Sequence, residues 1–266
     1  MAPSASPPMP PPSLRQRKVM GASMFVAAAA APTAAATVAT TGAASKFPPH
    51  HTLTSLSVTH VQFLQNDIVS KLMAYITLSP LGILCGYAAV IITSRDLKPT
   101  IMFAGQIANE VVNQVLKRLV KQARPTEYLG DGYGMPSSHS QFMAYFAVYT
   151  MILMYRSPST PDFLMPHIVS TAVFVWAALV VYSRVHLYYH TWQQVVAGTI
   201  AGAAFALIYY FIIQNILRPT GIFDKIVNHP WMKLLYVRDT DAIADVAKYD
   251  WEMWQQFQKS SRVKTE

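Results

Sequence analysis

Three groups of cationic, hydroxyl and imidazole side chains alternate with apolar segments between residues 117 and 194. The first motif group runs from Lys117 to Pro125, the second from Tyr133 to Gln141 and the third from Ser183 to Gln194. Lysine and arginine suit phosphoryl oxygens, and histidine can transfer a proton or act as a nucleophile. Because the groups stand at the ends of apolar segments, they indicate chemistry on an anionic group at a membrane surface.

The composition is typical of a polytopic membrane protein. Of the 266 residues, 52% are hydrophobic and only 13% are charged, and the mean hydropathy is +0.25. These values are too apolar for an ordinary soluble domain. The net charge of +8 does not indicate nucleic acid, because the cations are scattered or stand at the ends of apolar runs. Anionic lipid headgroups or phosphate are the better partners, and the single cysteine, Cys85, excludes an intrachain disulfide.

The apolar segments predict an all-α, polytopic transmembrane helical bundle with four to five spans. We expect the spans at about 68–92, 100–120, 137–155, 163–182 and 191–217. In the second span, Asn109, Asn113 and Lys117 recur at four-residue steps, so one polar face points into the bundle. This span is polar enough that a partly re-entrant course stays open. Gly198 and Gly202 in the last span allow close helix packing.

Composition divides the chain into three regions. Residues 1–50 are first rich in Pro and Ser and then uncharged and rich in Ala and Thr, which indicates a disordered or targeting-like extension. Residues 51–220 form the transmembrane catalytic bundle and begin with a short amphipathic piece at 53–67. Residues 221–266 are a polar C-terminal tail whose aromatic residues favour a membrane interface.

The distribution of cations predicts the orientation. If the loops 125–136 and 183–191 share one side, the opposite side holds Arg95, Lys98, Arg156 and the C-terminal tail with Arg218, Lys225 and Lys233. The positive-inside rule then places that opposite side in the cytosol. The three motif groups are therefore expected on the non-cytosolic face.

Antiparallel spans bring the three motif groups together. The first ends the second span, the second begins the third span, and the third joins the last two. Lys117 and Arg124 are seven residues apart, so both project to one side if the helix persists to Ala123, before Pro125 stops it. Any one of these cations alone would indicate only an interfacial side chain. Three aligned groups indicate a site.

The second and third groups supply the candidate catalytic residues. Ser137, Ser138 and His139 occupy a helix start, where free N–H groups and the helix dipole bind anions. His139 there can donate a proton to a leaving oxygen. His190 and Gln194 are four residues apart at the start of the last span. Gln194 can therefore hold one imidazole nitrogen and leave the other free to attack.

His186 and His190 also have a spacing that can bind zinc on a helix. No carboxylate or cysteine nearby completes a ligand set, and Arg184 would repel the cation. We therefore expect no metal and no cofactor.

Together, the three motif groups resemble a known signature. The patterns Lys-x6-Arg-Pro at 117–125, Pro-Ser-x-His at 136–139 and Ser-Arg-x5-His at 183–190 resemble the type 2 phosphatidic acid phosphatase superfamily. Its members are metal-independent, helical lipid phosphatases. The amino-acid sequence at 133–143 and 189–195 is similar to that of the dolichyl diphosphate phosphatase branch, and the resemblance covers about residues 55–245.

The resemblance implies that His190 attacks phosphorus to form a phosphohistidine. His139 would protonate the departing oxygen and then activate water. The side chains implied to bind the phosphoryl oxygens are Lys117, Arg124, Ser137, Ser138 and Arg184.

One position departs from the broad superfamily, which usually has an aspartate where this chain has Gln194. A glutamine oxygen can orient the imidazole but cannot stabilise its positive charge as a carboxylate does. The dolichyl branch also carries glutamine here, so the departure favours that branch. Either Glu110 or Asp131 remains a candidate for the missing charge.

The resemblance implies hydrolysis of dolichyl diphosphate to dolichyl phosphate and phosphate at the lumenal face of the endoplasmic reticulum membrane. That reaction would recycle the lipid carrier of protein N-glycosylation. The expected partner is a membrane lipid substrate, a polyprenyl diphosphate. Two alternatives stay open: a phosphatase for phosphatidate, sphingoid phosphate or another polyprenyl diphosphate, and a non-catalytic lipid-binding membrane protein of the same fold.

Overall fold

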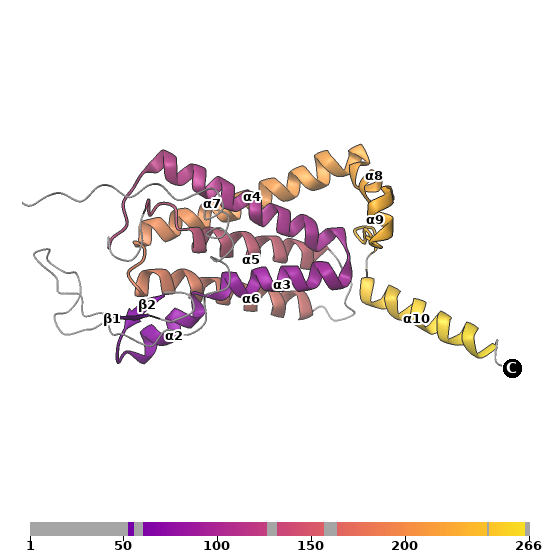
Figure 1. Cartoon of the computed structure of the whole chain (residues 1–266), viewed down its shortest axis with the longest axis horizontal. Helices are drawn as coiled ribbons and strands as arrows, with labels where there is room; N and C mark the ends of the chain where they lie inside the picture. The colour runs from indigo at the N-terminus through magenta and orange to yellow at the C-terminus, as the bar shows by residue number, and fades with distance from the viewer. Residues whose placement is uncertain (1–52, 56–60, 127–131, 157–163, 244, 264–266) are drawn as a thin grey trace, which may run out of the picture. The chain divides into compact units, whose positions relative to one another are not determined.

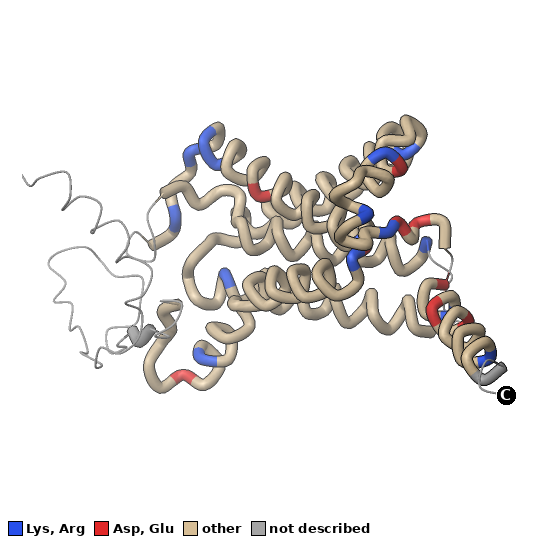
Figure 2. The backbone as a smooth tube through the Cα atoms, turned by 45° about the vertical axis from the view of Figure 1, so that its right-hand side comes forward, with Lys and Arg blue, Asp and Glu red and all other residues tan. Residues whose placement is uncertain are grey.

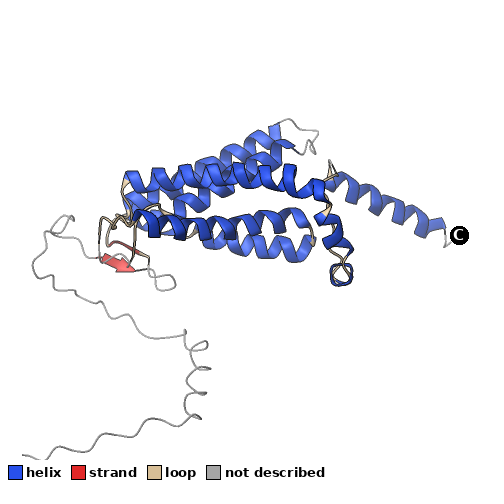
Figure 3. Ribbon diagram, turned by 90° about the horizontal axis from the view of Figure 1, so that it is seen from above, coloured by secondary structure: helices blue, strands red, loops and turns tan. Residues whose placement is uncertain are grey.

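The structure, a computed structural model, describes residues 53–55, 61–126, 132–156, 164–243 and 245–263. The described residues are almost entirely helical, with one pair of short strands (Figure 3). The strands β1 (Leu53–Ser55) and β2 (Gln62–Leu64) pair antiparallel. The α-helices are α2 (Ile68–Ile76), α3 (Ser79–Ser94), α4 (Leu97–Val120), α5 (Ser138–Arg156), α6 (Leu164–His186), α7 (Trp192–Phe211), α8 (Ile222–Asn228), α9 (Pro230–Leu234) and α10 (Val246–Val263). A π-helical turn (Ile212–Leu217) and a 3-10 turn (Arg218–Thr220) continue α7.

Helices α3 to α7 run alongside one another and form the bundle (Figure 1). Helix α5 packs against α4, α6 and α7. Three segments, Ile68–Ser94, Leu164–His186 and Trp192–Thr220, are long and apolar enough to cross a membrane. Helices α4 and α5 have 24 and 19 residues, or roughly 36 and 28 Å, against a bilayer core of about 30 Å. The predicted all-α, polytopic membrane bundle is confirmed.

Most charged residues lie near the two ends of this bundle (Figure 2). One end, here called the motif end, carries the end of α4, the start of α5 and the turn between α6 and α7, where the three motif groups lie. The chain direction of the helices therefore gathers groups that are up to 77 residues apart in sequence (117 to 194).

The first predicted span, 68–92, is present as two helices separated at Thr77 and Leu78. Pro80 lies in the first turn of α3, where its missing N–H and its ring prevent α2 from continuing. The break turns the Thr77 hydroxyl toward Arg184, whose Nη1 donates to it at 2.8 Å. The amphipathic piece expected at 53–67 contains the two strands instead, and the Asp67 side chain caps α2.

Polar and small residues set the position of α5 between its neighbours. The amide of Asn113 donates to Gln141 Oε1 at 2.8 Å, and Gln141 Nε2 donates to Asn109 Oδ1 at 2.9 Å. All three side chains are buried, as expected for an inward polar face of α4. On the other side, a Cβ at Gly202 would overlap the Gln141 carbonyl oxygen, and one at Gly198 would lie 2.6 Å from the Ser137 carbonyl oxygen. These glycines allow α7 to approach the start of α5.

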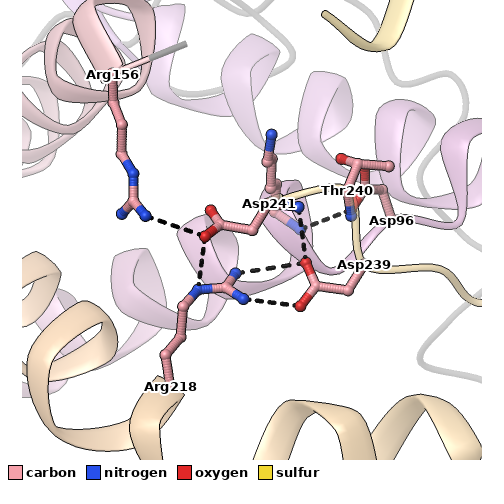
Figure 4. A network of polar contacts seen from close by, with 7 residues as sticks. Asp96, Arg156, Arg218, Asp239, Thr240 and Asp241 are labelled. Carbon is pink, nitrogen blue, oxygen red and sulfur yellow. Dashed lines mark hydrogen bonds and ion pairs between the residues drawn. The ribbon is translucent and has the colours of Figure 1, made fainter. Parts of the chain in front are cut away.

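A polar network holds the opposite end of the bundle (Figure 4). Arg218 contacts Asp239 at 2.8 Å and Asp241 at 3.0 Å, and Arg156 at the end of α5 contacts Asp241 at 3.2 Å. Thr240 donates to the buried Asp96, the N-cap of α4. The network therefore ties residues 239–241 of the C-terminal tail to the turn between α3 and α4. The interfacial placement of the rest of residues 221–266 stays a prediction.

Candidate active site

The turn between α6 and α7 places His190 beside Arg184. The backbone N–H groups of Tyr189 and His190 both donate to the Arg184 carbonyl oxygen at 3.1 Å. This closes a tight loop directly after α6, and His190 is left only 4% exposed. Its imidazole therefore lies inside the motif end, next to the start of α7.

Gln194 holds the His190 ring. Gln194 Oε1 lies 3.1 Å from His190 Nδ1, and Gln194 Nε2 donates to the Ala123 carbonyl oxygen at 2.8 Å. The Ala123 carbonyl can only accept, so it assigns the amide nitrogen to that side and the amide oxygen to His190. Nδ1 consequently carries the proton, and the lone pair of Nε2 is free for nucleophilic attack.

The local sequence fixes Gln194 through a helix cap. Thr191 is the N-cap of α7: its hydroxyl accepts from the Gln194 N–H, and the Gln194 side chain accepts from the Thr191 N–H. This reciprocal pair is a capping box. The Thr-x-x-Gln pattern was visible in the sequence, yet the role of Thr191 in holding the glutamine was missed.

The surroundings of His190 favour its neutral form. Burial lowers the pKa of His190 to about 3, and the nearby charges of Arg184, Arg124 and Lys117 act in the same direction, against a smaller opposing effect of the Gln194 hydrogen bond. An imidazole with this pKa is unprotonated at neutral pH and needs no base to become a nucleophile. The positive charges of these three cations therefore all disfavour the imidazolium form of His190.

The first motif group reaches the site by a loop. Helix α4 ends at Val120, as predicted for the second span, so the condition that the helix persist to Ala123 is not met, and Lys121 takes a left-handed conformation with φ 52°. Beyond this turn, the Gln122 carbonyl accepts from the Gly134 N–H at 2.7 Å, and the Ala123 carbonyl accepts from Gln194. Bonds to the second and third groups thus replace the missing helical turn.

The cations of the first group approach the site differently. Lys117, in the last turn of α4, donates from Nζ to Ser138 Oγ at 2.5 Å. Arg124 lies in the loop, half-buried, and its Nε has no hydrogen-bond partner among the described residues. A group that is buried and unpaired in this way is suited to bind an anion that enters the site.

The second motif group begins α5. Ser138 is the first residue of the helix and faces Lys117, whereas Ser137 is fully buried. The Ser137 N–H donates to the Gln194 carbonyl at 3.1 Å, and its hydroxyl accepts from Ser140. Ser137 therefore packs against the start of α7 and is fully buried, rather than exposed at the motif end. His139 is half-buried in the first helical turn, within electrostatic reach of His190.

Arg184 is held by residues that the sequence did not single out. Its guanidinium is 5% exposed, donates to Thr77 and lies 4.1 Å from the ring centroid of Tyr189. A cation over an aromatic face is stabilised without being neutralised. Tyr189 adjoins the histidine in the sequence pattern, but nothing in the sequence indicated Thr77, because it reaches the site only through the break after α2.

Comparison with known proteins identifies the family of this chain. The PAP2 superfamily model matches residues 98–218, which contain all three motif groups. Dolichyldiphosphatase 1 of Dictyostelium discoideum is 39% identical over 203 residues, or 75% of this chain and 88% of that protein. Dolichyldiphosphatase 1 of Homo sapiens is 38% identical over 207 residues, or 74% of this chain and 86% of that protein. The chain belongs to the dolichyldiphosphatase family of the PAP2 superfamily.

A solved structure of a PAP2 superfamily member is also similar. It is the transmembrane PAP2 type phosphatidylglycerolphosphate phosphatase from Bacillus subtilis, with 23% sequence identity and a TM-score of 0.48. The similarity covers 57% of this chain and 80% of that one.

Within this PAP2 site, the remaining candidates point elsewhere. His186 Nε2 lies 3.2 Å from Ser70 Oγ and 3.8 Å from Asp67 Oδ2, so it faces α2. Glu110 accepts from Gln114 Nε2 on the same helix at 2.6 Å. Asp131 lies outside the described residues. Among the residues that are described, no three His, Cys, Asp or Glu side chains gather as a metal site.

Proposed function

We propose that this chain hydrolyses dolichyl diphosphate to dolichyl phosphate and phosphate. The observation that carries the proposal is the position of His190, which is held at Nδ1 by Gln194 among three cations of the motif groups. Relatives named dolichyldiphosphatase, at 38 and 39% identity, support the choice of substrate. Because the PAP2 family model spans the same residues, the chemistry is that of a lipid phosphate phosphatase.

In the first step, His190 Nε2 attacks the terminal phosphorus and forms a P–N bond. The bond between that phosphorus and the bridging oxygen breaks, and dolichyl phosphate leaves. His139 donates a proton to the departing oxygen. Arg124 and Arg184 stabilise the phosphoryl oxygens as their charge redistributes, and Lys117 does so together with Ser138.

In the second step, water attacks the phosphohistidine. His139, now unprotonated, accepts a proton from the water, the P–N bond breaks, and inorganic phosphate leaves. The electron pair of the P–N bond returns to His190 Nε2, which restores the neutral imidazole. Gln194 holds the ring throughout, because its Oε1 accepts from Nδ1–H in every state.

The membrane location gives this reaction its setting. Within the described residues, three helical segments are apolar and long enough to span a membrane, and the candidate site lies at one end of the bundle. The opposite end carries Arg95, Arg156 and Arg218, and the tail that follows adds Lys225 and Lys233. Because the positive-inside rule counts Lys and Arg, these residues support a non-cytosolic site. We place the protein in the endoplasmic reticulum membrane with the site toward the lumen, where dolichyl phosphate would be returned for further N-glycosylation.

The test is a substrate panel on detergent-purified protein, with and without chelator. Dolichyl diphosphate should be hydrolysed with a higher kcat/KM than phosphatidate or sphingoid phosphate, and the chelator should have no effect. A preference for phosphatidate would make the chain a lipid phosphatase of another specificity. Activity lost on chelation would exclude the histidine mechanism as written.

The nucleophile is tested by His190→Ala, with His229→Ala as the matched control. His229 is exposed and lies between α8 and α9. We expect His190→Ala to fall below about one part in 10⁴ of the parent rate, as for loss of other enzymic nucleophiles. His139→Ala should accumulate an acid-labile phosphoenzyme that His190→Ala never forms. Near-normal turnover by His190→Ala would disprove the mechanism.

A further inference from the structure

An apolar groove lies between α3, α5 and α6, below the candidate active site. Its volume is about 430 Å³, and its walls include Ser79 and Gly82 of α3 and Met143 of α5. Ligand sites in proteins are typically about 300–1,000 Å³ and mostly apolar. The three helices lie side by side in the bundle (Figure 1), so the groove is at the depth of the membrane rather than at its surface.

The groove continues from the site on two of its walls. On α5, Met143 and Phe146 follow His139 by four and seven residues, which places them on the same helix face and roughly 6 and 10 Å deeper along the axis. On the chain entering α3, Thr77 contacts Arg184, and Ser79 begins the groove two residues later. Residues that line the groove therefore lie close along the chain to residues of the candidate site.

The third wall of the groove is formed by α6 and includes Trp176, which lines the same groove as Met143 and Phe146 of α5. Trp176 precedes Arg184 by eight residues, or roughly 12 Å along the helix. Its indole N–H donates to Ser79 Oγ at 2.9 Å and so bridges α6 to α3. Gly82 leaves the α3 wall open, because a Cβ there would meet nothing within 4 Å. The groove is therefore formed on three sides and accessible from the lipid.

We propose that this groove binds the isoprenoid units of the substrate chain that are next to the diphosphate. The inference rests on the proposed function, since it assumes that the headgroup occupies the site around His190. A polyprenyl diphosphate must keep its anionic end at the membrane surface while its chain enters hydrocarbon. The groove supplies an apolar surface within the bundle, and the Trp176–Ser79 hydrogen bond joins two of its walls.

The experiment compares Gly82→Leu with Gly86→Leu. Both glycines are exposed on α3, one turn apart, with no neighbour within 4 Å of a Cβ, but only Gly82 lines the groove. Gly82→Leu should raise KM for dolichyl diphosphate about tenfold or more, the effect of a few misplaced carbons in an apolar pocket. Gly86→Leu should stay within about twofold of the parent protein.

A second measurement does not depend on turnover. A polyprenyl diphosphate with a diazirine on its second isoprene unit should photolabel Met143 or Phe146 in the parent protein and in Gly86→Leu. Labelling should fall in Gly82→Leu. If the two leucine variants have equal kinetics and equal labelling, the groove does not bind the substrate chain. The proposed function would survive that result as long as the parent protein hydrolyses dolichyl diphosphate. No hydrolysis of dolichyl diphosphate, with labelling of Met143 retained, would instead refute the proposed function alone.

Discussion

Gln194 provides the sharpest test of the site, because this one residue joins all three motif groups through its side chain and its backbone carbonyl. Its oxygen accepts from His190 Nδ1, its nitrogen donates to the Ala123 carbonyl, and its backbone carbonyl accepts from Ser137 N–H. The substitution Gln194→Glu keeps the size and the acceptor but removes the donor. It therefore breaks the bond to Ala123 while leaving an oxygen for His190.

The expected loss follows from the Ala123 contact. The Gln194 side chain is fully buried and donates to this carbonyl at 2.8 Å. Leaving a buried acceptor unpaired costs about 1–3 kcal/mol, which corresponds to roughly 5–150-fold in kcat/KM if the displaced loop no longer positions Arg124. The new carboxylate would also raise the pKa of His190 from its low value, since a negative charge favours the imidazolium. The acidic limb of the activity profile should therefore move to higher pH.

The assay is steady-state hydrolysis of dolichyl diphosphate across pH, for Gln194→Glu and for Gln193→Glu. Gln193 is the preceding residue of α7 and is exposed, so it controls for an added charge near the site. The control should keep the parent kcat/KM and pH profile. If Gln194→Glu also keeps both, Gln194 does not brace the site, and the reasoning is refuted.

Two further expectations concern stability. The pKa of His190 is about 3 in the folded protein against an ordinary 6.5, so below pH 6.5 the unfolded chain gains a proton that the folded chain does not. As the pH is lowered from 6.5 to 3, the free energy of unfolding should therefore decrease, by at most ~1.4 kcal/mol per pH unit. Thermal melts at several pH values should show a smaller decrease for His190→Gln than for the parent protein. Parallel pH dependences of the two proteins would contradict this. Gly202→Ala should lower the free energy of unfolding by about 1–3 kcal/mol, because the added Cβ overlaps the Gln141 carbonyl oxygen. The control Gly86→Ala adds a Cβ that meets nothing and should leave the protein as stable as the parent. Equal Tm values for the two variants would show that α5 and α7 are not tightly packed.

Local patterns in the sequence predicted the helices well. Apolar runs marked the bundle, and the four-residue repeat of Asn109 and Asn113 predicted a polar face of α4 that the structure shows bonded to Gln141. The spacing of His190 and Gln194 likewise predicted their contact. Each of these features depends on helical periodicity, which neighbouring residues determine.

The parts that could not be predicted depend on contacts between distant segments. The chain turns at Lys121 and then follows bonds to Gly134, Gln194 and the Tyr188 carbonyl, which accepts from Thr126 at 2.8 Å. None of these partners is near in sequence, so the spacing of residues along a helix could not predict the course of this loop. The contact of Thr77 with Arg184 spans 107 residues and was missed for the same reason.

The neutral side chain at position 194 has a consequence for how charge is balanced. Within the part of the chain that the structure describes, no carboxylate forms an ion pair with Lys117, Arg124 or Arg184, and Glu110 contacts Gln114 instead. An aspartate at position 194 would supply a fixed negative charge to an imidazolium. In the proposed mechanism, with Gln194 at this position, the phosphoryl group of the substrate would be the nearest anion for the positive charge that develops on His190. The three unneutralised cations would bind that same group, so in this mechanism the negative charge of the substrate would both balance the cations and stabilise the attacking histidine.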